Sequence, residues 1–285
     1  MQDLKGKVAF ITGGASGIGL SMAHAFGAEG MAVMLADIEP EALERAVEGL
    51  REKQIRADGL IADVTGREVV RAAARETVAK FGKVHVVCNN AGVGAGGPLG
   101  TVPARDWDWV IDVNLKGVVY GVEEFAQILQ AQGEGGHFVN TASLAGMVSP
   151  PGMEPYCATK FAVVAISEGW AEQLAPQNIG VSILCPGFVK TRIHESRRNR
   201  QAAYGPDERG PPPPDAPPSR VLSGIPAEAV GKRVVEAVKA NELYVFTHPG
   251  ARAGVAARFE RILAAFDAAD ASTALEGLPN VGLLD

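Results

Sequence analysis

Two side chains four residues apart, Tyr156 and Lys160, form the pair in this sequence best suited to proton transfer. Positions i and i+4 share one face of a helix, so the phenol and the ammonium are expected to lie together. A nearby ammonium lowers the pKa of tyrosine from about 10 towards the range of a general base. A pair of this kind is by default a surface pair. Ser143, thirteen residues before Tyr156 and at the end of a predicted strand, favours a general-base site instead.

A glycine cluster, Gly13, Gly17 and Gly19, lies between the first predicted strand and the first predicted helix. Its spacing is Gly-x-x-x-Gly-x-Gly, which differs from the Gly-x-Gly-x-x-Gly fingerprint of many dinucleotide-binding proteins. Turns without side chains let backbone N–H groups and a helix N-terminus approach a pyrophosphate. We therefore predict cofactor binding by this loop, including Ser16 and Ile18, although a purely structural strand–helix turn is the alternative. No Gly-Lys-Ser/Thr follows, which disfavours an NTPase phosphate loop.

Asp37 stands at the end of the second predicted strand, 18 residues beyond Gly19. A carboxylate at this place can accept hydrogen bonds from both hydroxyls of the adenosine ribose, and it would repel a 2′-phosphate. Neither Ser16 nor Ile38 supplies the cation that NADP would require. The sequence therefore predicts NAD rather than NADP as the cofactor. The alternative for Asp37 is a helix cap before Glu39-Pro40.

A second group of glycines follows the fourth predicted strand, beginning with Asn89-Asn90-Ala91-Gly92. It continues with Gly94, Gly96, Gly97 and Gly100. Loops at the carboxyl ends of parallel strands are where ligands bind in open sheets, so this loop is expected to lie across from the first glycine cluster. A simple turn is the lesser alternative.

Short apolar runs alternate with helical patterns along the chain, which predicts an α/β fold. The expected strands are Lys7–Thr12, Ala32–Ala36, Gly59–Ala62, Val84–Cys88, Gly136–Thr141, Val181–Cys185 and Leu243–Thr247. The expected helices are Gly17–Glu29, Pro40–Glu52, Glu68–Phe81, Pro103–Gln132, Tyr156–Ala175, Pro226–Ala240 and Ala251–Ala269. This order predicts one domain over residues 1–285, a three-layer Rossmann fold with a doubly wound, seven-stranded parallel sheet and helices on both faces.

The alternation breaks in residues 192–224, where four consecutive prolines, Pro211 to Pro214, exclude helix and central strand. A linker between domains is one interpretation. The chain beyond residue 224 is too short for a second α/β core, so we favour an insertion that forms a lid over the substrate. The arginines Arg192, Arg197, Arg198 and Arg200 precede the prolines. They form either a solvated face or a site for an anionic group.

The composition excludes several classes of protein. The 27 Lys and Arg against 33 Asp and Glu give a net charge of −6, which offers no basic surface for nucleic acid. Three cysteines form no CxxC pair and five histidines show no metal-ligand spacing, so we expect reduced thiols and no metal. No apolar run is long enough for a membrane span or a signal core. We therefore expect a cytoplasmic protein, in which nine of the 34 glycines fall in the two loops Gly13–Gly19 and Gly92–Gly100.

Taken together, these motifs resemble the short-chain dehydrogenase/reductase family in its shorter, single-domain form, over nearly the whole chain. The matching segments are Thr12–Gly19, Asp63-Val64, Asn89–Gly92, Asn114, Ser143, Tyr156, Lys160, Pro186-Gly187, Val189 and Thr191. The resemblance implies a catalytic tetrad of Asn114, Ser143, Tyr156 and Lys160. Asn114 fits this role because asparagine is otherwise a poor choice in the middle of a helix.

The resemblance also implies what each group does. Tyr156 removes the proton of a substrate hydroxyl while hydride passes to the nicotinamide, and Ser143 holds the substrate oxygen. Lys160 binds the nicotinamide ribose and lowers the pKa of Tyr156, while Asn114 positions a water that relays the proton outward. Besides the glycine loop and Asp37, the implied contacts to NAD are Asp63, Val64, Asn90, Ala91, Gly92, Tyr156, Lys160, Pro186, Gly187, Val189 and Thr191. The sequence does not set the direction, and NAD favours oxidation.

The substrate is expected to be a bulky secondary alcohol. The residues flanking the tetrad are largely apolar, namely Leu144, Met147, Val148, Pro150, Pro151, Met153 and Phe188, with Gly94–Gly97 opposite. Such a row favours a roomy apolar pocket, with ordinary loop packing as the alternative. The proline-rich segment and the strand end at Leu243–Pro249 resemble a subgroup that oxidises the benzylic Cα alcohol of lignin-type β-aryl ethers. A steroid or another hydrophobic alcohol remains an alternative.

Two further classes stay open at this point. One is a non-catalytic nucleotide-binding protein of the same fold, which loss of Tyr156 or Lys160 would indicate. The other is a lyase or epimerase that uses bound NAD transiently. The resemblance also implies a homodimer or homotetramer, formed through the helices at Pro103–Gln132 and Tyr156–Ala175.

Overall fold

The structure is a computed structural model of the chain and describes residues 1–207 and 219–279. The prolines from Pro211 to Pro218 in the predicted lid lie outside the described residues. The chain divides into two compact units, residues 1–247 and residues 248–285. All seven predicted strands belong to the first unit. The prediction of one domain over the whole chain stays a prediction.

A parallel sheet forms the centre of the first unit, with the strand order β3-β2-β1-β4-β5-β6-β7. Each neighbouring pair of strands is parallel. The strands are β1 (Val8–Thr12), β2 (Ala32–Asp37), β3 (Ala57–Ile61), β4 (Val86–Asn89), β5 (Gly136–Thr141), β6 (Ile179–Cys185) and β7 (Tyr244–Phe246). The predicted doubly wound, seven-stranded sheet is confirmed.

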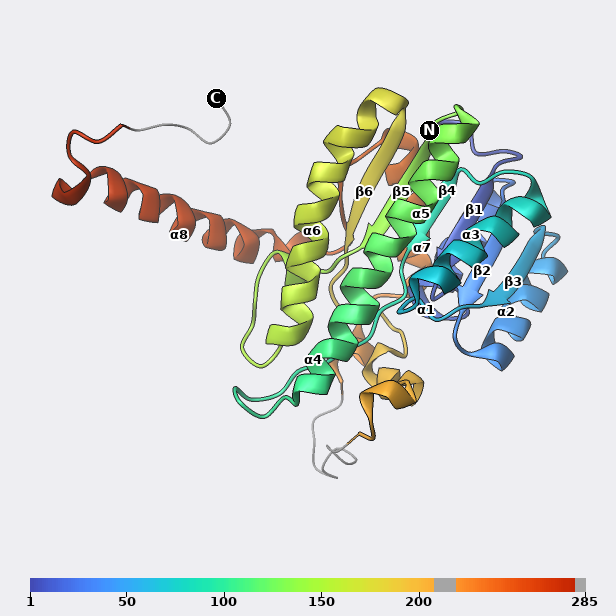
Figure 1. Cartoon of the computed structure of the whole chain (residues 1–285), viewed down its shortest axis with the longest axis horizontal. Helices are drawn as coiled ribbons and strands as arrows, with labels where there is room; N and C mark the ends of the chain where they lie inside the picture. The colour runs from blue at the N-terminus through green and yellow to red at the C-terminus, as the bar shows by residue number, and fades with distance from the viewer. Residues whose placement is uncertain (208–218, 280–285) are drawn as a thin grey trace. The chain divides into compact units, whose positions relative to one another are not determined.

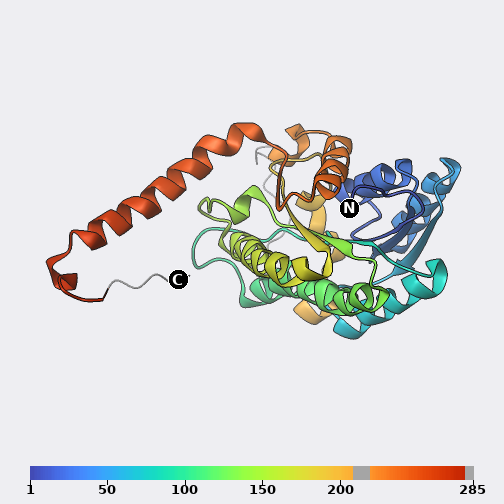
Figure 2. The ribbon, with the colours of Figure 1, turned by 90° about the horizontal axis from the view of Figure 1, so that it is seen from above.

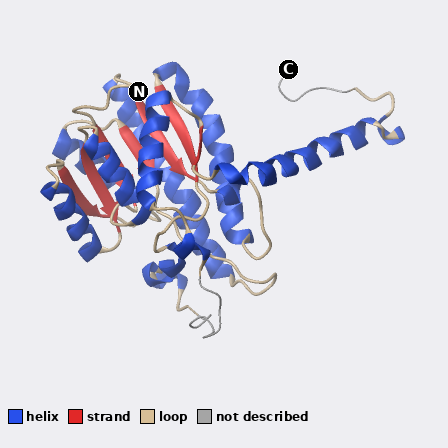
Figure 3. Ribbon diagram, turned by 180° about the vertical axis from the view of Figure 1, so that it is seen from behind, coloured by secondary structure: helices blue, strands red, loops and turns tan. Residues whose placement is uncertain are grey.

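Helices cover both faces of this sheet, which gives the three layers (Figure 1). The helices on one face are α1 (Gly17–Ala28), α2 (Pro40–Glu52) and α7 (Ala227–Ala240). Those on the other face are α3 (Arg67–Phe81), α5 (Gly117–Gln132) and α6 (Glu154–Leu174). The view from above in Figure 2 shows the strands between the two helix layers, and Figure 3 shows the same arrangement from behind.

Strand β1 shows that the sheet is buried on both faces. All five of its residues are buried, and successive side chains point to opposite faces. Ala9 and Ile11 pack in the core under α1, α2 and α7. Phe10 packs in the opposite core, where its ring lies 4.5 Å from the ring of Phe125 on α5, centroid to centroid. A continuous apolar run is therefore what a central parallel strand requires.

The strand order reverses between β1 and β4. From β1 the chain winds outward to β3, then returns to place β4 on the other side of β1. In open parallel sheets, ligands bind at the carboxyl ends of the strands at such a switch point. The two glycine clusters of the sequence follow β1 and β4, so both lie at this point.

The predicted helix at Pro103–Gln132 is interrupted. It consists of α4 (Ala104–Ile111), a π-helical turn at Asp112–Lys116 and α5. Single π-helical turns within helices are frequent at functional sites, and this one contains Asn114. The short 3₁₀ turns are Leu144–Gly146, Ala175–Gln177, Ile193–Asn199, Ala202–Tyr204, Arg220–Ser223, Pro249–Ala251 and Thr273–Leu275.

The second unit is built around one helix, α8 (Arg252–Asp270), close to the range predicted from the sequence. Its large apolar side chains recur every three or four residues, at Phe259, Ile262, Leu263 and Phe266. In the part of the chain that the structure describes, no helix combines the length and hydropathy that a membrane span requires.

Candidate active site

The first glycine loop connects β1 to the N-terminus of α1. Gly13 and Gly17 adopt positive φ angles of 61° and 55°, which glycine reaches without strain. A Cβ at Gly19 would lie 2.1 Å from the Gly13 carbonyl oxygen, so that position accepts only glycine. Ser16 is the N-cap of α1, and its side chain makes no capping hydrogen bond. The loop and the helix N-terminus therefore form a backbone cradle that fits a pyrophosphate.

The second glycine loop is tied to the first by Asn90. The Nδ2 of Asn90 donates to the carbonyl oxygens of Thr12 and Gly13 at 3.0 and 3.3 Å. The Oγ1 of Thr12 accepts the backbone N–H groups of Asn90 and Ala91 at 2.9 and 3.0 Å. These hydrogen bonds join the end of β1 to the end of β4. Thr12 makes this connection, a role that the sequence did not predict for it.

Asp37 is the last residue of β2, and the residue is 8% exposed. Its Oδ2 accepts the N–H of Ala15 in the glycine loop at 2.9 Å, and its Oδ1 accepts the N–H of Glu39 at 3.1 Å. The N-cap of α2 is Glu39 rather than Asp37. A carboxylate has about four acceptor positions, so Asp37 keeps capacity for two ribose hydroxyls.

Asp63 and Val64, which follow β3, differ in the contacts that they make. The Oδ1 of Asp63 accepts the N–H and hydroxyl of Thr65 at 3.0 and 2.8 Å. Its Oδ2 accepts from Nε2 of Gln201 at 2.9 Å. Val64 is buried and packs against the backbone of α5 at Gly117. Asp63 therefore acts here as a junction between β3 and the segment after β6.

The side chains predicted to be catalytic meet at the carboxyl ends of β5 and β6. Ser143 follows β5, and its Oγ lies 3.3 Å from the Pro186 carbonyl oxygen and accepts the N–H of Ala145 at 3.1 Å. Tyr156 and Lys160 lie in the first part of α6. Ser143 is close enough to the Tyr156 phenol to favour its ionised form, and Nζ of Lys160 lies 5.5 Å from the centroid of the Tyr156 ring. The structure therefore brings the three predicted side chains together.

The expected low pKa of Tyr156 is wrong for this structure. Burial raises the pKa of Tyr156 to about 12, because it disfavours the phenolate more than Ser143 favours it. Burial also lowers the pKa of Lys160 to about 8. Lys160 is 3% exposed, and its Nζ donates to the Thr141 carbonyl oxygen at 2.7 Å. The ammonium faces the ring rather than the hydroxyl, so it does not offset the burial of Tyr156.

Asn114 is fully buried in the π-helical turn. Its Oδ1 accepts the N–H of Val93 at 2.8 Å, and its Nδ2 donates to the Val93 carbonyl oxygen at 2.9 Å. A longer contact of 3.4 Å joins Nδ2 to Oγ1 of Thr159 on α6. Asn114 therefore holds the second glycine loop by its backbone. This pairing with Val93 explains why a polar residue is buried there.

The predicted nicotinamide loop follows β6. The Pro186 carbonyl accepts the N–H of Leu144 at 2.9 Å, which places the loop beside Ser143. Val189 is buried and forms an isolated parallel bridge with Ile225. A Cβ at Gly17 would lie 3.0 Å from Cγ2 of Thr191, so Thr191 lies directly against the first glycine loop. Gly187 lies between these anchors. The loop thus connects the glycine loop to Ser143.

Comparison with known proteins identifies the family. Residues 7–202 match the family model described as short chain dehydrogenase. The chain belongs to this family. This short-chain dehydrogenase is 36% identical to the C alpha-dehydrogenase of Sphingobium sp. strain SYK-6, over 92% of the chain and 87% of that protein. It is 31% identical to the CLA biosynthesis dehydrogenase/reductase of Lactiplantibacillus plantarum, over 100% of the chain and 99% of that protein.

A solved structure shows the same fold. It is the crystal structure of a short-chain dehydrogenase/reductase from Burkholderia phymatum in complex with NAD. The TM-score is 0.85 and the identity 40%, over 92% of this dehydrogenase and 96% of that chain. The fold class that the sequence predicted is therefore shared with that solved structure.

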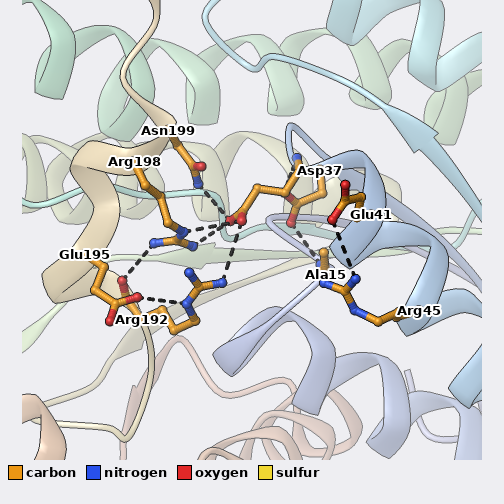
Figure 4. Close-up of polar contacts among 9 residues, drawn as sticks. Ala15, Asp37, Glu41, Arg45, Arg192, Glu195, Arg198 and Asn199 are labelled. Carbon is orange, nitrogen blue, oxygen red and sulfur yellow. Dashed lines mark hydrogen bonds and ion pairs between the residues drawn. The ribbon is translucent and has the colours of Figure 1, made fainter. Parts of the chain in front are cut away.

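The four arginines after β6 are not a free anion site in this dehydrogenase. We name residues 192–207 the strap. Arg192 and Arg198, both labelled in Figure 4, approach Glu39 at the start of α2. Arg197 and Arg200 contact Asp106 on α4 at 2.7 and 2.8 Å. All four guanidinium groups meet carboxylates of the chain itself, so the anion-site hypothesis is wrong for this structure.

The strap contacts one side of α4. Asp106, Trp109 and Asp112 are spaced three residues apart. Nε1 of Trp109 donates to Oε1 of Gln201 at 2.9 Å, and the Tyr204 hydroxyl donates to Oδ2 of Asp112 at 2.7 Å. Sequence reasoning missed these contacts. Their only signal was the three-residue spacing of polar groups and a tryptophan, which is common on helices.

The apolar residues near the tetrad fall into two groups. Met147 is buried, whereas Met153 and Phe188 are partly exposed at 36% and 46%. The second glycine loop runs along the turn before α6, where the Gly97 N–H donates to the Gly152 carbonyl at 2.8 Å. Met153 and Phe188 are therefore exposed near the predicted tetrad, as are Pro150 and Pro151.

Proposed function

We propose that the protein is an NAD-dependent oxidoreductase that transfers hydride between a secondary alcohol and NAD. The observation that supports this most directly is the meeting of Ser143, Tyr156 and Lys160 at the same sheet edge as the glycine cradle. The family membership supports it independently. A protein of this fold without turnover would not need to bury a lysine beside a tyrosine.

In the oxidation direction, each residue has its own role at the substrate hydroxyl. Tyr156 accepts the hydroxyl proton at its phenolic oxygen as the C–H bond of the carbinol carbon breaks. Ser143 donates a hydrogen bond to the substrate oxygen and keeps it beside the phenol. Lys160 holds the ribose next to the nicotinamide, and Asn114 positions a water that relays the proton from the site. Ketone reduction uses the same groups in reverse.

The proposed cofactor site runs from Asp37 across the glycine loop to Thr191. Asp37 accepts from the adenosine ribose, and the N-terminus of α1 binds the pyrophosphate. When bound, NAD supplies the hydride acceptor and, in its oxidised form, a positive charge that favours the phenolate. The similar chain from Burkholderia phymatum was crystallised with NAD, which supports this choice of cofactor.

The proposed substrate is a bulky benzylic alcohol, the Cα alcohol of a lignin-derived β-aryl ether. The C alpha-dehydrogenase that is similar over 92% of the chain supports this choice. The exposed side chains of Met153 and Phe188 would contact the aromatic rings. Residues 192–224 would form the lid over this substrate, and two or four copies would assemble through α5 and α6. The protein would act in the cytoplasm.

The test is a panel of alcohols with NAD and with NADP, followed by the absorbance of the reduced cofactor. The panel contains both enantiomers of β-aryl ether model alcohols, simple benzylic alcohols and a steroid alcohol. We expect NADH from one β-aryl ether enantiomer, at a higher kcat/KM than from the other alcohols. Binding of NAD without reduction by any alcohol would refute the oxidoreductase proposal. Preference for the steroid would refute the substrate alone.

A further inference from the structure

Two cations and one carboxylate meet beside the residue proposed to bind the adenosine ribose (Figure 4). Glu39 accepts from Nε of Arg198 at 3.3 Å and from Nδ2 of Asn199 at 2.9 Å. Nη1 of Arg192 lies 3.7 Å from Oε2 of the same carboxylate. The strap therefore places two guanidinium groups beside the loop between β2 and α2.

This cluster is adjacent to Asp37. The backbone N–H of Glu39 donates to Oδ1 of Asp37 at 3.1 Å, so the two acidic residues share one tight turn. The other oxygen of Asp37 accepts from Ala15 in the glycine loop. A ribose bound by Asp37 would have its 2′ position beside this turn. Any group added at that position would meet the cluster as well as Asp37.

We propose that Glu39 is a second determinant of the preference for NAD, because it neutralises two arginines that would otherwise form a 2′-phosphate site. The inference rests on the proposed ribose contact of Asp37. Guanidinium groups bind phosphate through paired, charge-assisted hydrogen bonds. In this protein Arg198 already donates to Glu39, and Arg192 lies at ion-pair distance from the same carboxylate. A 2′-phosphate therefore meets two carboxylates, and the two arginines of the strap are already paired with carboxylates.

The arginines should stay in place when the charge of Glu39 is removed. Nη1 of Arg198 also donates to the carbonyl oxygen of Arg192 at 3.1 Å. Farther along, the strap is held by the Arg200–Asp106 ion pair, whose side chains are 4% and 3% exposed. Arg192 keeps a second partner in Glu195 at 2.9 Å. Arg198 is therefore the cation that neutralising Glu39 releases most fully.

Direct binding of two nucleotides without nicotinamide tests the proposal. The ligands are AMP and adenosine 2′,5′-bisphosphate, titrated by calorimetry at a fixed ionic strength. The variants are Asp37→Asn, Asp37→Asn/Glu39→Gln and Asp37→Asn/Glu41→Gln. Glu41 is the matched control, because it pairs with Arg45 on α2 and both side chains are exposed. Glutamine keeps the size of glutamate and removes only its charge.

We expect Asp37→Asn/Glu39→Gln to bind the bisphosphate at least about tenfold more tightly than Asp37→Asn does, the effect of one charge-assisted hydrogen bond. The Glu41 control should change this affinity by less than about twofold, as exposed pairs do. Adding Arg198→Gln to the Glu39 variant should remove the gain. An equal gain in the Glu41 control, or a gain that survives Arg198→Gln, would overturn the proposal. So would no gain at all.

The outcomes separate this inference from the proposed function. Binding of either ligand is measured without turnover, so the test gives a result even if the protein oxidises no alcohol. AMP binding that Asp37→Asn leaves unchanged would refute the ribose contact on which the inference rests. Thermal melting checks that each variant is folded, and Asp37→Ser/Glu39→Gln against Asp37→Ser repeats the comparison if asparagine at position 37 disturbs the turn.

Discussion

Burial controls the chemistry of single residues in this site. It raises the pKa of Tyr156 to about 12 and lowers the pKa of Lys160 to about 8, so each shift favours the neutral form. Residue types and spacing predicted that the two side chains would meet. The sign of the Tyr156 shift was not predictable, because it depends on how much solvent the surrounding loops remove and on where the ammonium points.

Tyr156→Phe removes the proposed base and leaves the ring in place. We expect kcat for alcohol oxidation to fall by about 10²- to 10⁴-fold, the usual contribution of a general base. NAD affinity, measured by titration, should stay nearly unchanged because the hydroxyl faces Ser143. Tyr120→Phe, on α5, is the matched control and should keep full activity. Retained turnover in the Tyr156 variant would refute the assignment of the base.

His137 links stability to pH at a residue far from the chemistry. It is fully buried on β5, and burial lowers its pKa to about 3. The Ser182 hydroxyl donates to the Glu242 carbonyl at 2.6 Å, so its oxygen accepts from Nε2 of His137 at 2.8 Å. Among the described residues Nδ1 of this ring has no hydrogen-bond partner. The neutral ring is therefore the folded form.

The consequence is a loss of stability in acid. Below pH 6.5 the unfolded chain binds a proton at His137 that the folded chain does not bind, until the pH falls to about 3. The free energy of unfolding should fall in this window by up to about 1.4 kcal/mol per pH unit from this residue. Urea unfolding of the protein and of His137→Gln, at several pH values, measures the difference. Parallel pH dependence in the two proteins would contradict the prediction.

At the scale of elements, the local patterns predicted most of the structure. The strand predicted at Lys7–Thr12 lies at Val8–Thr12, and the helix predicted at Pro40–Glu52 has those bounds. Two features could not be predicted. The π-helical turn depends on Asn114 pairing with the Val93 backbone, and the strap depends on contacts with α4 about ninety residues earlier in the chain. Neither leaves a distinctive pattern in the sequence, because the three-residue spacing on α4 is common on helices.

The strap should loosen when its buried ion pair is broken. Asp106→Asn leaves the guanidinium of Arg200 buried without its full charge partner, which typically costs about 3 to 5 kcal/mol. We expect faster amide hydrogen exchange in residues 192–204 and a higher KM for the substrate. Glu195→Gln, in the same segment, weakens its pairs with Arg192 and His194, in which Glu195 is half exposed, and should cost less than about 1 kcal/mol. Equal exchange in the two variants would show that Asp106 does not hold the strap.

At the scale of the whole molecule, the apolar cores all belong to the first unit. Among residues 1–207 and 219–279, the three buried clusters contain no residue beyond Val245, which is the middle of β7. The sheet that positions the site is therefore complete before residue 248. This division between a site-bearing unit and a C-terminal unit was not visible in the sequence, because α8 has an ordinary helical pattern. Burial, rather than helical pattern, separates it from α7.

Removing residues 248–285 should therefore leave the dehydrogenase folded. Because the cores end at Val245, we expect the Tm to change by no more than about 4 °C, equivalent to about 1 kcal/mol for a domain of this size. NAD affinity should be retained, since Asp37, the glycine loop and Thr191 all remain. Thermal melting and calorimetric titration of the truncated and full-length chains measure both quantities.

The same truncation distinguishes the surfaces that could join copies of the chain. We propose assembly through α5 and α6, both of which the truncated chain keeps, so light scattering should give both chains the same number of subunits. Substituting Phe259 and Phe266 on α8 by serine in the full-length chain is the control, and it should also leave the mass unchanged. If the truncated chain and this double variant both become monomers, then α8 forms the interface, because it is the only element that both changes affect.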